Sequence, residues 1–137
     1  YAFRALLESF AVAEFSRLAW DAQIKELGLA IQKLNEAAKM EEKQILLDAK
    51  SHVYKIILDG CGNKLVSESL NKLLDRVNIL RGTSLLQPDR LSKSLKEIDQ
   101  MFKAIKDRDY EKSKTLAYEH IQAASKIALR VLSETSS

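Results

Sequence analysis

Apolar residues recur at every third or fourth position along almost the whole chain, the spacing that places side chains on one face of an α-helix. Breaks in this pattern are few, because the 137 residues include only four glycines and one proline. Composition and spacing together predict mostly helix and little strand. A chain of this length can bury a core of its own, so we expect one all-α domain over residues 1–137.

Short breaks divide the chain into about six expected helices, and short connections predict antiparallel neighbours in a bundle. Asp21, Asn63 and Asp109 are expected N-caps, because their side chains can accept hydrogen bonds from the first-turn amides. The two glycines of 59–62 permit positive φ and end the third helix. The expected helices are residues 2–19, 21 to about 40, about 41 to 58, 63 to a stop at 82, the turn at 87–89 to a break at 107–109, and 109 to the serine-rich end at 133–137.

Several function classes are not indicated by the composition. The single cysteine, Cys61, excludes an intrachain disulfide framework, and nothing resembles a signal peptide, so we expect a reducing, cytoplasmic setting. No apolar run approaches about 18 residues, so no membrane partner is expected. We find no paired-carboxylate, Cys/His or Ser/His/Asp constellation on one face, and we therefore do not expect an enzyme.

The net charge of +3 is spread along helix faces rather than clustered. Basic and acidic residues alternate, as in 93–97, which is typical of a solvated surface. Basic residues do not gather around aromatic ones, so direct nucleic-acid binding by this segment is not indicated.

A histidine stands in the middle of an apolar helix face. His120 lies near the centre of the apolar stripe of the sixth expected helix, and Ile98 lies near the centre of the stripe of the fifth. A stripe this wide faces a core, so the imidazole is expected to point into the interior. The two stripes consist of Leu91, Leu95, Ile98, Met101, Phe102 and Ile105, and of Leu116, Ala117, His120, Ala124, Ile127 and Val131.

Short motifs occur in a fixed order along the chain. They are Arg4-x-x-Leu7-Glu8, Asn63 after a small-residue turn, Ser94-x-x-Glu97, Ala104-Ile105, Asp109 and His120-Ile121. Together they resemble the FCD effector domain, the ligand-sensing half of FadR/VanR-type regulators in the GntR family. That resemblance implies a homodimer that binds a small anionic metabolite, often a carboxylate, and controls DNA binding by a winged helix-turn-helix domain absent from this chain. Because the chain starts at Tyr1 and is helical at once, we expect it to be part of a longer protein.

Many FCD domains hold a divalent metal through one Asp and three His. The resemblance assigns each of these four ligand positions to a residue of this chain. The Asp position is occupied by Lys50 and the first His position by Tyr54. Ile98 occupies the second, and only His120 matches the pattern. One imidazole without a carboxylate is too few ligands for a tight site, so no metal and no cofactor are expected.

A second register for the metal pattern starts from Asp48 and His52, which also have the D-x-x-x-H spacing. Helical geometry places both about 160–200° away from the buried stripe of their helix. We therefore interpret His52 as a surface histidine.

The candidate ligand-binding residues are Arg4, Lys50, Tyr54, Ile98 and His120. Lys50 should project into the interior, where an ammonium needs an internal acid, a bound anion or a route to solvent. His120 is either a core histidine bonded to Tyr54 or to a backbone carbonyl, or a residue that contacts the effector. Arg4 is either an i,i+4 partner of Glu8 or, by the resemblance, a pocket arginine.

A second hypothesis is a helical dimerisation scaffold whose degenerate pocket is filled by its own side chains. The first and fourth expected helices are rich in apolar residues, so Phe3, Phe10, Leu70 and Leu74 are candidates for the dimer contact. The sequence does not separate interface from core at these positions.

Overall fold

The computed structural model describes residues 2–73, 87 and 89–135. Residues 64–73 are helical, and no strand occurs in the described residues, which confirms the predicted all-α fold of about six helices. Within the same residues, no helix has both the length and the apolar character needed to cross a membrane. The helices with complete bounds are α1 (Ala2–Leu18), α2 (Asp21–Ala37), α3 (Lys43–Gly60), α5 (Arg90–Lys106) and α6 (Tyr110–Thr135).

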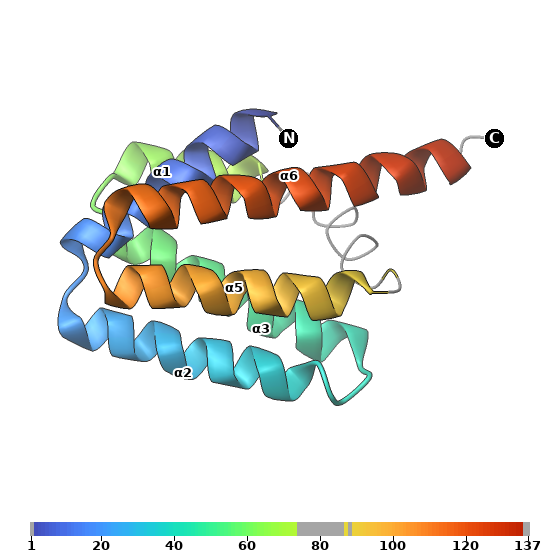
Figure 1. Ribbon diagram of the computed structural model, residues 1–137, viewed down its shortest axis with the longest axis horizontal. Coiled ribbons are helices and arrows are strands. Elements are labelled where there is room, and N and C mark those ends of the chain that lie inside the picture. Colours follow the sequence, from blue (N-terminus) through green and yellow to red (C-terminus); the bar gives the residue numbers. More distant parts are fainter. Residues whose placement is uncertain (1, 74–86, 88, 136–137) are drawn as a thin grey trace.

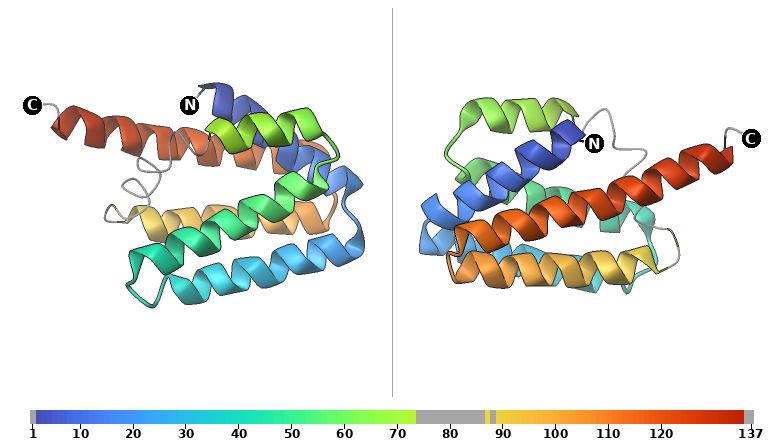
Figure 2. Two further views of the ribbon diagram at one scale, coloured as in Figure 1. Left: turned by 180° about the vertical axis from the view of Figure 1, so that it is seen from behind. Right: turned by 45° about the horizontal axis from the view of Figure 1, so that its top comes forward.

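The helices form a bundle of antiparallel neighbours (Figure 1). α2 packs along α3 and α5 packs along α6, each pair joined by a short connection, while α1 packs against α6. Figure 2 shows residues 64–73 beside the N-terminal half of α1, and it shows α6 extending past the other helices at its C-terminal end. The interior therefore lies between α1, α2, α3, α5 and α6.

Three local predictions about helix ends are confirmed. The Val66 amide donates to Oδ1 of Asn63 at 3.1 Å, and the Lys112 amide donates to Oδ1 of Asp109 at 3.1 Å. Both side chains thus satisfy a first-turn amide that has no partner within its helix. Gly62 has a φ of 75°, the left-handed conformation expected of the glycine turn after α3.

Two other helix starts differ from the prediction. Trp20, not Asp21, is the N-cap of α2, and its amide donates to Oε1 of Gln23 at 2.8 Å. The Gln23 side chain therefore satisfies the amide of the N-cap residue itself, whereas the Asp21 carboxylate was expected to accept from amides of the turn that follows it. α5 begins only after Asp89, whose φ is 67°. The expected stop at Gly82 and the turn proline Pro88 lie outside the described residues.

α1 leaves several of its bulky apolar residues outside the core. Phe3, Leu6 and Leu18 are exposed, at 61%, 62% and 43%. The buried face instead carries small residues that allow α6 to approach closely, and Oγ of Ser16 lies 3.3 Å from Oγ of Ser113 on α6. The buried residues of α1 are Arg4, Ala5, Glu8, Ser9, Ala11, Val12, Ala13, Phe15 and Ser16.

Phe15 shows how closely α1 meets α3. Its side chain is fully buried, and a Cβ atom placed on Gly60 would lie 2.6 Å from its ring. Gly60 therefore leaves the space that the Phe15 ring fills, which fixes the position of α3 in the core.

Candidate ligand-binding site

An internal cavity lies where five helices meet. Its volume is about 30 Å³, enough for about one water molecule. Most of its wall is apolar, and the polar side chains on it are Glu8 of α1, Lys50 and Tyr54 of α3, and His120 of α6. The apolar wall consists of Val12, Leu27, Ile31, Val53, Ile57, Ile98, Met101, Phe102, Ile105, Ala117 and Ile121.

Four of the five candidate ligand-binding residues line this cavity. Lys50, Tyr54, Ile98 and His120 converge on it from α3, α5 and α6. Lys50 is only 7% exposed, and its charge acts on the imidazole of His120, where it helps to lower the pKa. Helical spacing therefore correctly predicted that Lys50 and Tyr54 lie on the inward face of α3.

Arg4 is not among the residues that line the cavity, and its expected contact with an effector stays a prediction. The residue is 2% exposed, and its Nε atom forms an ion pair with Oε2 of Glu8. The i,i+4 pairing considered from the sequence is therefore the arrangement observed. Glu8, one turn further along α1, is the member of the pair that reaches the cavity wall.

The second register for a metal site is excluded by the orientation of α3. Asp48 and His52 are both exposed, and Oδ1 of Asp48 accepts a hydrogen bond from Gln44 at 2.8 Å. The interpretation of His52 as a surface histidine is confirmed.

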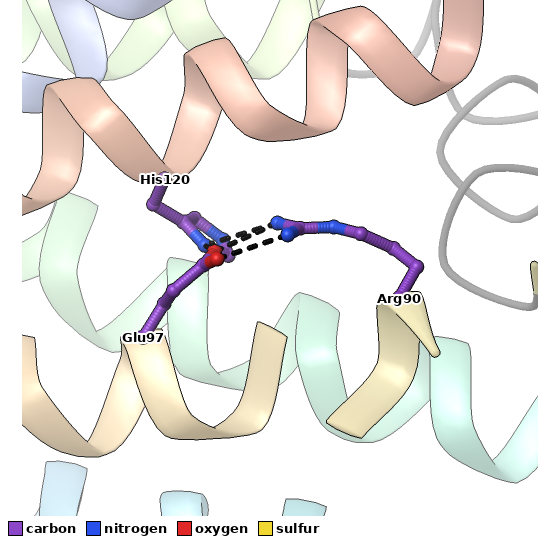
Figure 3. Close-up of polar contacts among 3 residues, drawn as sticks. All are labelled: Arg90, Glu97 and His120. Carbon is purple, nitrogen blue, oxygen red and sulfur yellow. Dashed lines mark hydrogen bonds and ion pairs between the residues drawn. The ribbon is translucent and has the colours of Figure 1, made fainter. Parts of the chain in front are cut away.

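Arg90, Glu97 and His120 form a polar cluster next to the cavity (Figure 3). Arg90 donates twice to the Glu97 carboxylate, from Nη1 to Oε2 at 2.9 Å and from Nη2 to Oε1 at 2.8 Å. Oε1 of Glu97 also lies 2.6 Å from Nδ1 of His120. Nδ1 of His120 is therefore paired with a carboxylate, a partner that the sequence did not suggest.

Sequence reasoning missed this cluster because it treated 93–97 as a solvated face. Lys93 and Lys96 are exposed as expected, but the Glu97 side chain is only 28% exposed and Arg90 is 5% exposed. The usable signal was spacing. Arg90 and Glu97 stand seven residues apart on α5, which is two helical turns on one face.

Burial and hydrogen bonding shift the pKa values of Glu97 and His120, the two groups of the cluster discussed here. Burial alone would raise the pKa of Glu97, but the hydrogen bonds from His120 and Arg90 outweigh it and lower the pKa to about 2. Burial lowers the pKa of His120 to about 4, and the charges of Lys50 and Arg90 act in the same direction against the hydrogen bond to Glu97. At neutral pH the cluster therefore contains a carboxylate and a neutral imidazole.

The ionised carboxylate fixes the tautomer of His120. A carboxylate can only accept, so the proton of the neutral ring lies on Nδ1 and is donated to Glu97. Nη2 of Arg90 lies 3.5 Å from the same Nδ1, and this contact is not a hydrogen bond because both atoms are donors. Nε2 of His120 is left with a lone pair, and the ring lines the cavity as a hydrogen-bond acceptor.

The donor set on the cavity wall does not fit the metal that related domains hold. A carboxylate is replaced by Lys50, and Tyr54 and Ile98 stand at two imidazole positions. Among the described residues, no group of three or more His, Cys, Asp or Glu side chains is arranged to hold a metal ion. The hydrogen bond that His120 donates to Glu97 orients the ring as carboxylates orient metal-bound imidazoles. The other three ligand positions of the family pattern are occupied by Lys50, Tyr54 and Ile98.

A mostly apolar cavity with a few convergent polar groups, inside a helical bundle, is the arrangement of a small-molecule-binding domain. The family model of the FCD domain matches residues 1–123, a range that includes all four candidate residues on the cavity wall. The chain belongs to the FCD domain family, the effector-binding domains of GntR-type transcription regulators. Such regulators are typically non-enzymatic. No curated protein sequence matches the chain.

Proposed function

We propose that this domain binds a small carboxylate inside the bundle and thereby controls DNA binding by a winged helix-turn-helix domain outside this chain. The observation that carries the proposal is Lys50, which is 7% exposed and lines a mostly apolar cavity together with His120. The Lys50 ammonium places a positive charge at the wall of this cavity, and a carboxylate ligand would be attracted to that charge.

The remaining wall suits the rest of such a ligand. The Tyr54 hydroxyl can donate a second hydrogen bond to the carboxylate, and a bond to an ionised group is stronger than one between neutral groups. Ile57, Ile98 and Met101 offer an apolar surface for its hydrocarbon part. Where related domains use a metal cation to hold the anion, this chain would use the cation of Lys50.

Binding requires the bundle to open. The cavity of about 30 Å³ is far smaller than the roughly 300–1,000 Å³ of typical ligand sites. Met101 and Phe102 of α5 form part of the wall, and the flexible Met101 side chain can repack when a ligand enters. We expect α5 and α6 to move apart from α3 on binding, and this movement is the coupling between effector and DNA.

The same proposal includes a homodimer. Phe3 and Leu6 of α1 are 61% and 62% exposed, and Leu65 on the neighbouring helical segment is 73% exposed (Figure 2). A second copy of the chain that covers these side chains would remove their apolar surface from water. Of the two roles that the sequence left open for Leu70, interface or core, its complete burial gives the core, and Phe10 is half-buried. Leu74 lies outside the described residues.

The second candidate function is a dimerisation scaffold that binds no effector. The small cavity volume favours it, because the side chains of the wall already fill most of the interior. In that case Lys50 would have only a structural role.

A thermal-shift screen separates the two candidates. A ligand that binds only the folded state raises the apparent melting temperature by mass action. A panel of carboxylates of increasing length is compared with the primary amides of the same carbon skeletons, which have the shape without the charge. The effector domain is stabilised by some of the carboxylates and not by their amides, whereas the scaffold responds to neither series.

A further inference from the structure

A groove lies on the surface where the N-terminal half of α2 meets the C-terminal end of α5, two helices that run side by side in opposite directions (Figure 1). Its volume is about 610 Å³, and it is largely open to solvent. Small molecules are usually covered over most of their surface, so an open groove of this size is better suited to a segment of another protein chain. The groove is lined by Asp21, Ile24, Lys25, Gly28, Leu29, Phe102, Lys106 and Arg108.

A glycine shapes the apolar part of this groove. The Phe102 ring lies against Gly28, where an added Cβ atom would be 2.8 Å from Cζ of the ring. Gly28 stands inside α2, and a glycine inside a helix lowers the stability of that helix. Its missing side chain gives the ring its place between the two helices. Next to it, Leu29 is 55% exposed, so the domain leaves apolar surface in the groove in contact with water.

The charged side chains of the groove are mostly cationic. Arg108 forms an ion pair of 2.9 Å with Asp21, so the one acid of the lining is already matched. Lys25 and Lys106 form no ion pair with any residue that the structure describes, and the Lys106 ammonium lies 5.1 Å from the centre of the Phe102 ring. Two exposed positive charges without an acidic partner therefore border the apolar part of the groove.

We propose that this groove is a docking surface for an amphipathic helix of another protein, one that carries acidic residues beside its apolar stripe. Two helices packed side by side leave a groove in which the apolar face of a third helix can lie. The stripe covers Ile24, Leu29 and Phe102, and acids at its edges lie near Lys25 and Lys106. The proposal does not depend on whether the internal cavity binds an effector.

Other occupants fit the groove less well. The phosphates of a nucleic acid would meet the two lysines, but a sugar-phosphate backbone has no apolar surface to cover Leu29. A membrane binds apolar side chains that protrude from a surface, whereas those of the groove line a hollow. A second copy packed groove to groove about a two-fold axis would bring the same lysines of both chains together, and like charges repel.

Fluorescence anisotropy with designed peptides tests the proposal. Three labelled peptides of about 18 residues, or five turns, are held helical by a side-chain cross-link. They share one leucine stripe and differ only in the flanking positions, which are Glu, Gln or Lys. The Glu peptide should bind the wild-type domain roughly threefold to tenfold more tightly than the Gln peptide, because exposed ion pairs contribute modestly. The Lys peptide should bind more weakly than both.

Substitutions in the domain locate the contact. Lys25→Gln combined with Lys106→Gln should abolish the preference for the Glu peptide and leave the affinity for the Gln peptide unchanged. Lys43→Gln combined with Lys55→Gln, at exposed positions of α3, changes the net charge equally and should keep the preference. Leu29→Glu puts an acid on exposed apolar surface of the groove, so it should weaken the Glu peptide at least tenfold without unfolding the domain.

Four outcomes would overturn the proposal. They are a wild-type domain that does not bind the Glu peptide, equal affinity for the Glu and Lys peptides, Glu-peptide binding that survives Leu29→Glu, and a preference that survives the loss of Lys25 and Lys106. Labelled DNA or anionic vesicles that bind through these lysines while the Glu peptide does not would assign the groove to those partners. A dimeric wild type and a monomeric Leu29→Glu in light scattering would assign it to a second copy of the chain.

Discussion

Nδ1 of His120 lies 2.6 Å from Oε1 of Glu97, and this contact sets how the imidazole can interact with anything in the cavity. Glu97 is in turn held by two hydrogen bonds from Arg90, so the carboxylate stays ionised and acts only as an acceptor. His120 therefore donates to the protein on one side and offers a lone pair on the other. At this part of the cavity wall, the imidazole can accept a hydrogen bond from a ligand but cannot donate one.

Nitrogen NMR can check this tautomer directly. The chain has two histidines, and the exposed His52 provides an internal reference in the same spectrum. At pH 7 we expect His120 to be neutral with its proton on Nδ1. A protonated Nε2, in either the cationic ring or the other neutral tautomer, would contradict the assignment.

The same cluster predicts how stability depends on pH. The pKa of His120 falls from 6.5 to about 4 on folding, so between these values the unfolded chain binds a proton that the folded chain does not. The pKa of Glu97 falls from 4.5 to about 2, with the same sign at lower pH. The free energy of unfolding therefore decreases as pH falls from about 6.5, by about 1.4 kcal/mol for each pH unit that one such group contributes.

Urea unfolding at a series of pH values measures this effect. In His120→Asn, the side-chain amide can still donate to Glu97 but cannot titrate, so the loss of stability between pH 6.5 and 4 should become much smaller. His52→Asn, at the exposed histidine, is the control and should keep the wild-type dependence. An unchanged pH dependence in His120→Asn would show that other groups cause it.

Part of this site could be predicted from sequence, and the rest required the fold. Helical spacing correctly directed Lys50, Ile98 and His120 inward, because the apolar residues on the same helices define one buried face each. Arg90 and Glu97 were missed, because a charged residue on a helix ordinarily faces water. Their burial results from a contact between α5 and α6, which spacing within one helix does not reveal.

α1 shows a second limit of sequence reasoning. Bulky apolar residues usually mark the core face of a helix, yet Phe3 and Leu6 are exposed. Here the core face carries Arg4 and Glu8, which satisfy each other as an ion pair, together with small residues that fit the close approach to α6. The pattern of apolar residues along a helix does not show whether an apolar face packs into the core of its own domain or is exposed at the surface.

Exposed apolar residues on α1 give a prediction about assembly. Light scattering of the domain at high micromolar concentration should give about twice the monomer mass of 15.5 kDa. Leu6→Glu should shift the equilibrium towards the monomer, because it places a charge in the contact. Leu29→Glu, at a similarly exposed position on α2, should remain a dimer, and a monomeric wild type would contradict the proposal.

Gly60 gives a prediction about packing. A Cβ at this position would lie 2.6 Å from the Phe15 ring, so Gly60→Ala should destabilise the domain by about 1–3 kcal/mol through overpacking. Phe15→Leu in the same chain should recover part of this loss, and a double-mutant cycle from urea unfolding measures the coupling. Additive effects of the two substitutions would mean that the helices separate freely here.

The side chains at the metal-ligand positions of the family pattern predict that the domain holds no transition metal. Elemental analysis of protein purified without added metal should find far less than one zinc, nickel or manganese per chain. Added zinc should also leave the melting temperature unchanged, because binding to the folded state would raise it. One bound metal per chain would mean that donors other than those of the cavity wall hold it.

The central claim is that the buried cation of Lys50 holds an anionic effector. Calorimetric titration of the tightest carboxylate from the screen into the wild type, Lys50→Met and Lys55→Met tests it most directly, because Met keeps much of the side-chain shape and Lys55 is exposed on the same helix. Loss of one partner of a buried charged pair costs several kcal/mol, so Lys50→Met should raise the Kd by well over tenfold. Lys55→Met should bind as the wild type does. Equal affinity in all three proteins would contradict the account.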